Sequence, residues 1–82
     1  MVADEILAIL RCPENRTRLA RAPAGLIERL NRRITAGELL NRAGRQVEKP
    51  LDEGLIREDG KMLYPVRDGT PVLLVDEAIP LE

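Results

Sequence analysis

The chain has 82 residues and a formal net charge of −1, with one tyrosine and no phenylalanine, tryptophan, histidine or serine. A chain of this length forms a single domain, residues 1–82, whose core is thin and in this case aliphatic. Cys12 is the only cysteine, which excludes an intrachain disulfide, and without histidine it has no soft co-ligand for zinc.

Common kinds of catalytic chemistry are also excluded. Without serine or histidine the usual nucleophile–base pairs are missing, and the glycines do not form a phosphate-binding loop. The acidic start of the chain and the short apolar run at residues 6–10 fit neither a signal peptide nor a membrane span. We therefore expect a cytoplasmic, non-enzymatic protein that needs no cofactor.

The first predicted element is a short helix over residues 3–10, because Ile6, Leu7 and Leu10 recur on one apolar face. Pro13 ends this helix, since the residue before a proline favours extended geometry. A polar turn then leads to a short predicted strand at residues 18–22.

A helical hairpin is predicted for residues 24–49. Apolar residues recur at helical spacing in two stretches, separated by a capping-box pattern with Thr35 as the N-cap of the second helix and Glu38 as its partner. Gly44 is placed to end that helix. Two helices joined in this way also occur in DNA-reading helix-turn-helix motifs, although most such pairs are packing units. The two apolar faces comprise Leu26, Ile27, Leu30 and Ile34, and then Leu39, Leu40 and Ala43.

The last third of the chain is predicted to be β structure. Asp59-Gly60 lies between two strand-like runs, and a type I′ turn at these two residues would join the runs into a hairpin. Pro65 is expected to end the second strand because it has no N–H to donate. Asp68-Gly69 forms another turn before a short strand at residues 72–75, and residues 76–82 form a loosely held acidic tail.

Several single residues are candidates for a special role. Cys12 is predicted to be buried and structural, since no base accompanies it. Tyr64 is either a core residue whose hydroxyl bonds the backbone or an exposed anchor at a protein interface. Turn geometry explains Asp68, whereas Arg67 has no such local explanation and is the better functional candidate.

Charge is unevenly distributed along the sequence. Residues 11–49 carry ten basic and four acidic residues, whereas residues 50–82 carry three basic and eight acidic residues. A basic middle could bind nucleic acid or an acidic protein face, or it could be a solvated surface that the acidic tail balances. A pI near 5.5 and the lack of stacking rings weigh against a dedicated nucleic-acid module. The candidate nucleic-acid contacts are Arg29, Arg32, Arg33, Arg42 and Arg45.

Two stretches resemble a known family. Ile-Leu-Ala-Ile-Leu-Arg-Cys-Pro at residues 6–13 and Leu-Tyr-Pro-Val-Arg-Asp-Gly-Thr-Pro-Val-Leu-Leu-Val-Asp-Glu-Ala at residues 63–78 are similar to Trm112-like proteins, including the small bacterial UPF0434 proteins. The resemblance implies a small α+β domain with a zinc-ribbon-like β core. It also implies an activating partner of a SAM-dependent methyltransferase, one that covers apolar surface of the catalytic subunit and transfers no methyl group itself.

The sequence departs from the family pattern in two respects. Cys12 matches the first cysteine of the family's zinc knuckle, but Asn15 occupies the position of the second, and the later cysteines would fall near Arg57 and Gly60. We therefore expect no metal at these degenerate positions. Residues 24–53 are longer and more helical than the family's usual hairpin and are interpreted as a helical insertion.

Together these features predict a single α+β domain with a metal-free, ribbon-like β core, a short N-terminal helix and an inserted helical hairpin. The expected function is that of a protein-interaction or accessory subunit, with a methyltransferase as the candidate partner and no membrane contact. The alternatives are a nucleic-acid-associated module and a small protein without a stable partner. The residues predicted to bind the partner are Tyr64, Pro65, Arg67, Asp68, Gly69 and Pro71.

Overall fold

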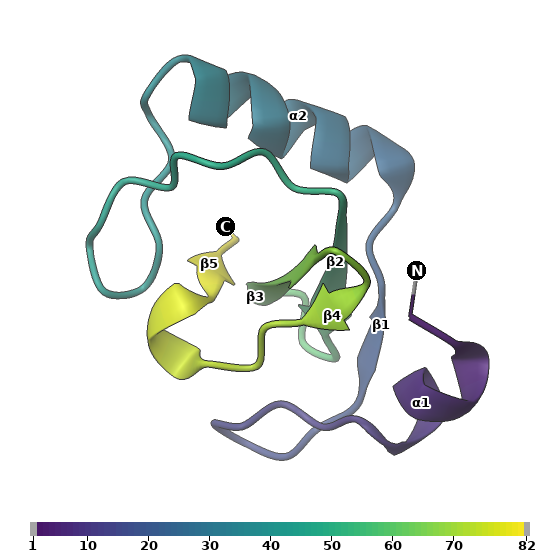
Figure 1. Ribbon diagram of the computed structural model, residues 1–82. Helices are drawn as coiled ribbons and strands as arrows, with labels where there is room; N and C mark the ends of the chain where they lie inside the picture. Colours follow the sequence, from purple (N-terminus) through teal and green to yellow (C-terminus); the bar gives the residue numbers. More distant parts are fainter. Residues whose placement is uncertain (1, 82) are drawn as a thin grey trace.

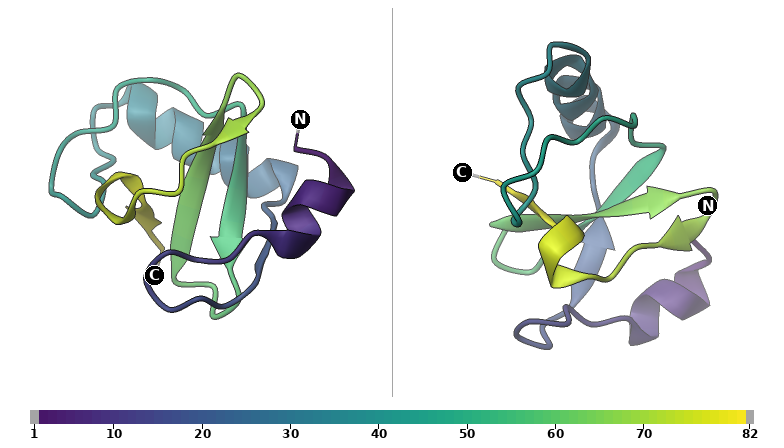
Figure 2. Two further views of the ribbon diagram at one scale, coloured as in Figure 1. Left: turned by 60° about the horizontal axis from the view of Figure 1, so that its bottom comes forward. Right: turned by 60° about the vertical axis from the view of Figure 1, so that its left-hand side comes forward.

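A curled antiparallel sheet forms the centre of the computed structural model, which describes residues 2–81 (Figure 1). The strands follow the order β1 (Leu19–Arg21), β2 (Glu53–Arg57), β3 (Met62–Arg67) and β4 (Thr70–Pro71), and β5 (Ile79–Pro80) pairs with the start of β3. Helices α1 (Asp4–Ile9) and α2 (Ala24–Thr35) lie on opposite faces of this sheet, and a short 3-10 helix, η1 (Val75–Glu77), precedes β5 (Figure 2). The expected α+β class is confirmed.

The sheet divides the core into two clusters. Cluster one lies on the α1 side and includes Cys12, Tyr64 and Val66, with Leu7, Leu10 and Leu73 packed against it. Cluster two lies under α2 and includes Leu30, Ile34, Leu39, Val47, Leu51, Leu63 and Ile79. Because successive side chains of a strand point to opposite faces, β3 contributes to both clusters, and its residues 62–66 are all buried.

The second helix predicted for the middle of the chain is absent, and that prediction was wrong. Gly37 adopts φ 73° and ends α2 in a Schellman motif, in which its N–H bonds the Ile34 carbonyl and the Glu38 N–H bonds the Arg33 carbonyl. The Thr35–Glu38 stretch is therefore the C-terminal end of one helix and not the start of another. The apolar residues after it alternate between buried Leu39 and exposed Leu40, as in extended chain.

Residues 38–52 instead form a loop that is fixed against α2 and the end of the chain. Leu40 and Gln46 form an isolated β-bridge, and the Val47 N–H bonds the Leu39 carbonyl. The Asn31 side chain on α2 accepts from the Leu51 N–H at 2.7 Å and donates to the Leu51 carbonyl at 3.0 Å. The description of residues 24–53 as an insertion stays a prediction, but this stretch is one helix and a loop.

The two predicted hairpin turns differ in geometry. Both residues of Asp68-Gly69 have positive φ, at 52° and 75°, so this pair forms the type I′ connection between β3 and β4. In the β2–β3 hairpin only Gly60 has positive φ, at 74°, and its N–H bonds the Arg57 carbonyl. The hairpin at Asp59-Gly60 is confirmed, but its predicted type I′ turn is wrong because Asp59 does not adopt the positive φ that such a turn requires. The Asp59 carboxylate accepts from the Lys61 N–H.

The end of the chain is more ordered than its sequence indicated. Strand β3 continues through Pro65, which lies opposite Gly54 and accepts from the Val72 N–H. The predicted strand at residues 72–75 is not formed, since pairing stops after β4. The predicted loose tail is also wrong up to residue 81, because Ala78 and Ile79 are fully buried. None of the helices within residues 2–81 is long and apolar enough to cross a bilayer.

Candidate protein-interaction site

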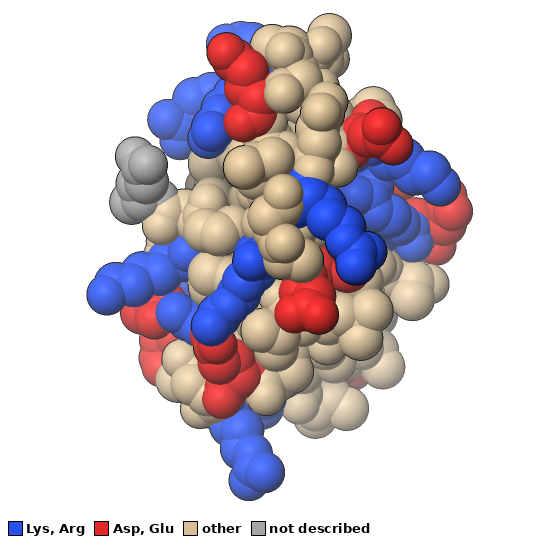
Figure 3. All heavy atoms as spheres, turned by 90° about the vertical axis from the view of Figure 1, so that its left-hand side faces the viewer, with Lys and Arg blue, Asp and Glu red and all other residues tan. Residues whose placement is uncertain are grey.

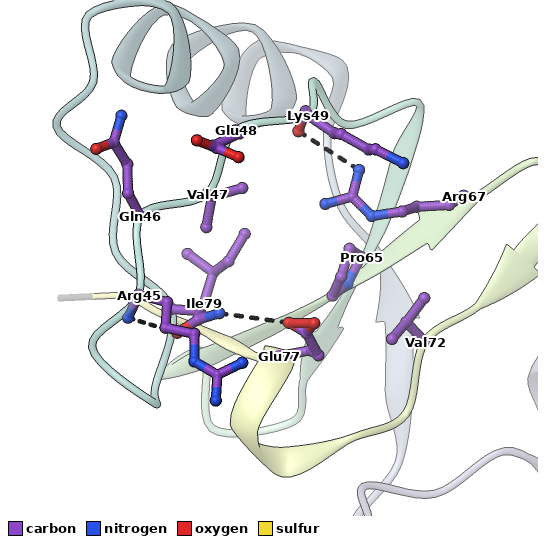
Figure 4. A pocket seen from close by; sticks show the side chains of 11 residues that line it. Arg45, Gln46, Val47, Glu48, Lys49, Pro65, Arg67, Val72, Glu77 and Ile79 are labelled. Atoms are coloured by element: carbon purple, nitrogen blue, oxygen red, sulfur yellow. Dashed lines mark hydrogen bonds between the residues drawn. The ribbon is translucent and has the colours of Figure 1, made fainter.

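A groove of about 400 Å³ opens beside the β3–β4 hairpin, between β3, the loop at residues 45–49 and η1 (Figure 4). Its floor is apolar and comes from Val47, Pro65, Val72 and Ile79. Charged side chains surround this floor, namely Arg45, Glu48, Lys49, Arg67 and Glu77. The groove therefore combines an apolar surface with charged groups of both signs, which is typical of a specific binding site.

Arg67 has a local structural role that the sequence did not reveal. Its Nη1 donates to the backbone carbonyls of Lys49, at 3.4 Å, and Pro50, at 3.1 Å. These bonds fix the loop to β3, and they leave the guanidinium at one side of the groove (Figure 4). Because the side chain is anchored by neutral carbonyls, its charge is available to a ligand.

The opposite side of the groove is organised by Asn41, which the sequence analysis missed. Its Oδ1 accepts from the Arg45 N–H at 3.0 Å, and its Nδ2 donates to Glu77 Oε2 at 3.3 Å. Asn41 thereby holds the turn at residues 41–44 and positions the Glu77 carboxylate. An asparagine followed three residues later by Gly44 is a turn signal, but it was interpreted as part of a helix.

The six residues predicted to bind a partner do not form one exposed surface. Tyr64 and Pro65 are buried, so the interpretation of Tyr64 as an exposed anchor is wrong. Asp68 and Gly69 form the exposed tip of the hairpin, where the Asp68 N–H bonds Asp52 Oδ2 at 3.3 Å. Pro71 is half-buried in β4. Of the six, Arg67 and Pro65 line the groove.

Tyr64 instead belongs to a buried polar cluster with Cys12. The Cys12 sulfur lies 2.9 Å from the Tyr64 hydroxyl oxygen. Burial alone raises the pKa of the Cys12 thiol, but hydrogen bonds with Tyr64, with the backbone at Asn15 and Glu14 and with Arg57 together lower it. Burial and the neighbouring Cys12 raise the pKa of Tyr64. The prediction that Cys12 is buried is confirmed, and a thiol without exposed surface is inaccessible to substrates.

The positions that we predicted to match the zinc ligands of Trm112-like proteins, Cys12, Asn15 and Arg57 among them, have other interactions in the structure. Arg57 places a guanidinium next to the Cys12 sulfur, and the Asn15 side chain is engaged with Thr17. Within the described chain, no three side chains of His, Cys, Asp or Glu gather as a metal site. Arg57 binds Glu14 at 2.7 Å and Asp59 at 2.8 Å, so ion pairs connect the turn after α1 to the β2–β3 hairpin.

Helix α1 exposes apolar side chains. Leu7 and Leu10 are half-buried against cluster one, but Ile6 and Ile9 are 47% and 72% exposed. The predicted inward face of Ile6, Leu7 and Leu10 is therefore wrong for Ile6. Two exposed isoleucines within one six-residue helix are an apolar surface beyond what the fold itself requires.

The five candidate nucleic-acid contacts are all exposed, but they do not act as one group. Arg29, Arg32 and Arg33 lie on α2, while Arg42 pairs with Glu14. On the face that carries the loop after α2, basic and acidic side chains alternate without a patch of one sign (Figure 3). Because the second helix is absent, the helix-turn-helix basis for DNA binding is also absent.

The fold defines a small antiparallel α+β domain, and a protein of known structure shares it. The chain is 33% identical to XF2673 from Xylella fastidiosa, whose solution NMR structure matches it with a TM-score of 0.76. That match covers 95% of this chain and 81% of XF2673.

Two curated proteins are similar in sequence over a shorter stretch. Over 37 residues, which are 45% of this chain, it is 49% identical to a UPF0434 protein of Ehrlichia chaffeensis and 46% identical to a UPF0434 protein of Ehrlichia canis. The match spans 64% of the length of each of these relatives. No family model matches the chain.

Proposed function

We propose that this chain is a UPF0434 protein that acts in the cytoplasm as a non-enzymatic accessory subunit, with α1 as the surface that a partner protein covers. The observation that carries the proposal is the exposure of Ile6 and Ile9. These side chains lie next to Leu7 and Leu10, which pack against cluster one, so a partner docked there would extend the core of a small domain. Burial of apolar area is the main favourable contribution to such association.

A SAM-dependent methyltransferase is the proposed class of partner. This part of the proposal is supported by the resemblance of residues 6–13 and 63–78 to Trm112-like proteins, which stabilise methyltransferases by covering apolar surface. One of these stretches contains the whole of α1 after its first two residues, and the other contains β3 after its first residue. An accessory subunit of this kind needs no catalytic residues for methyl transfer.

The proposal is tested by purifying the tagged protein from its host at moderate salt and identifying stoichiometric partners by mass spectrometry. We expect a SAM-dependent methyltransferase with the unmodified chain and its loss with the double variant Ile6→Glu, Ile9→Glu. The matched control is Leu40→Glu, which places a charge at another exposed apolar residue, 51% exposed, in the loop after α2. Circular dichroism checks that each variant folds.

Three results would contradict the proposal. Equal capture by both variants would show that α1 is not the interface. Recovery of the folded chain without any partner would favour a self-sufficient domain, whose resemblance concerns fold alone. Capture of nucleic acid that weakens steeply with salt would favour the nucleic-acid-associated alternative, with its contacts among the arginines of the basic middle.

A further inference from the structure

Three cations around the groove have no acidic partner within the described residues 2–81. Among residues 2–81, the ion pairs of arginine and lysine involve Arg21, Arg42 and Arg57. Arg45, Lys49 and Arg67 form none, although all three line the groove. We propose that this groove binds an extended acidic segment of a partner protein, in which carboxylates lie on one side of an aliphatic side chain.

The charge of the groove favours an anionic ligand. Its lining has three basic and two acidic residues, hence a local charge of +1 in a chain whose net charge is −1. Three unpaired cations on one small surface repel each other, and an acidic ligand relieves this repulsion. Like charges opposed across an interface are costly, so a basic segment would be rejected.

Arg67 supplies the main anchoring point. Its side chain is already fixed by the Lys49 and Pro50 carbonyls, so little rotamer entropy remains to be lost when a carboxylate binds. A guanidinium that keeps free N–H groups after these two bonds can still donate to a carboxylate. The ligand carboxylate is therefore assigned to the Arg67 side of the groove.

Glu77 determines which way round the bound segment lies in the groove. Asn41 holds its carboxylate on the opposite side from Arg67 (Figure 4). An acidic side chain placed there would face a like charge, whereas a backbone N–H would find an acceptor. The aliphatic side chain of the ligand is assigned to the floor of Val47, Pro65, Val72 and Ile79, between the two charged sides.

A peptide fits this groove better than a nucleic acid does. No aromatic side chain lines it, so bases would have no stacking surface. Phosphates on both sides of an apolar floor would meet Glu48 and Glu77 as well as the basic residues. The combination of one aliphatic pocket with charged sides is the kind of site that reads a short peptide motif.

The test measures fluorescence polarisation of a labelled, end-capped peptide in which three glutamates precede two leucines. The variant pair Arg45→Glu, Lys49→Glu reverses two groove charges whose side chains form no hydrogen bond or ion pair with another residue of the described part of the chain, 2–81. The matched control Arg29→Glu, Arg33→Glu makes the same change in net charge on the exposed side of α2. A second peptide carries serine in place of leucine.

We expect the groove variant to bind the peptide about tenfold more weakly, since reversing charges at a complementary interface removes attraction and adds repulsion. The α2 control and the unmodified chain are expected to bind alike, and the serine peptide is expected to bind more weakly than the leucine peptide. Absence of binding, equal weakening by both variants, or tighter binding of single-stranded oligothymidine would overturn the proposal.

The inference rests on the proposed function only in assuming that the chain meets a protein partner. The two proposals fail separately, because peptide binding is measured on the purified chain and the partner surface on α1 is tested by capture. If the α1 variant loses the partner but the unmodified chain binds no peptide, the accessory function is supported. The groove then has no part in that function.

Discussion

Cys12 and Tyr64, which are 52 residues apart in sequence, meet side chain to side chain in the interior of the molecule at 2.9 Å. Neither residue has exposed surface. The contact joins the turn that follows α1 to the central strand β3, so the N-terminal segment is fixed by a polar bond as well as by apolar packing.

Replacing Tyr64 by phenylalanine removes this bond and keeps the ring. We expect Tyr64→Phe to lower the free energy of unfolding by about 0.5–1.5 kcal/mol, the usual contribution of one hydrogen bond. Urea unfolding measures the change, and a double-mutant cycle with Cys12→Ala isolates the contact. If the two single changes add in the double variant, the bond contributes nothing.

Arg57 is the most buried cation described, at 8% exposed, and it binds both Glu14 and Asp59. We expect Arg57→Ala to destabilise the protein by about 1.5–3 kcal/mol, because hydrogen bonds to charged groups are lost at a protected site. Arg18→Ala, at an exposed position, is the control and is expected to change stability by less than about 0.5 kcal/mol. Thermal unfolding that shifts equally for both variants would show that the ion pairs are unimportant.

The same ion pairs make stability depend on pH. Arg42 lowers the pKa of Glu14, with Arg57 adding to the effect, and Arg57 lowers the pKa of Asp59. A carboxyl whose pKa is lower in the folded state stabilises the fold above its unfolded pKa, and this contribution is lost as pH falls through the folded pKa.

We therefore expect the urea midpoint to be constant near neutral pH and to fall as pH decreases from about 5 to about 3, around the unfolded values of Asp and Glu. Glu14→Gln is expected to start from a lower midpoint and to decline less steeply. A variant with the same slope as the unmodified chain would exclude Glu14 as a source of the pH dependence.

Gly54 lies in β2 where a side chain has no room. A Cβ at this position would lie 2.9 Å from both terminal carbons of Leu63 and 3.0 Å from Ile27 Cδ1. We expect Gly54→Ala to destabilise the fold by about 1–3 kcal/mol through overpacking.

Gly25→Ala is the matched control for this substitution. No atom outside its neighbours lies within 4 Å of the added Cβ, and Gly25 is in α2, where alanine is favoured by about 0.5–1 kcal/mol. The two alanine variants should therefore shift the thermal midpoint in opposite directions. Equal midpoints for both would show that Leu63 and Ile27 move aside without cost.

Local sequence patterns predicted the secondary structure correctly where neighbouring residues determine the backbone geometry. The helix over 24–35, the strand at 19–21 and both glycine-containing hairpins follow from periodicity and turn chemistry. The prediction of a second helix failed because Gly37 adopts positive φ and ends α2, so the Thr35–Glu38 pattern does not act as a capping box. The buried end of the chain could not be predicted, since Ile79 is ordered by β3 and not by its own neighbours.

The groove was only partly predictable for the same reason. Arg67 was identified because no local geometry explained it, but its bonds to Lys49 and Pro50 depend on how the loop returns to the sheet. Asn41 and Glu77 are 36 residues apart, and no pattern in the sequence relates them. Long-range contacts therefore form the part of the site that composition and residue spacing do not predict.

The division of the core by the sheet has a consequence for how the molecule opens. Cluster two is closed by the twelve-residue α2, whereas cluster one is closed by the six-residue α1, which is too short to be stable as an isolated helix. Amide hydrogens of α1 should accordingly exchange with solvent by a local opening, while those of β3 exchange only when the whole domain unfolds. The helix on one face of the sheet can therefore open while the helix on the other face stays in place.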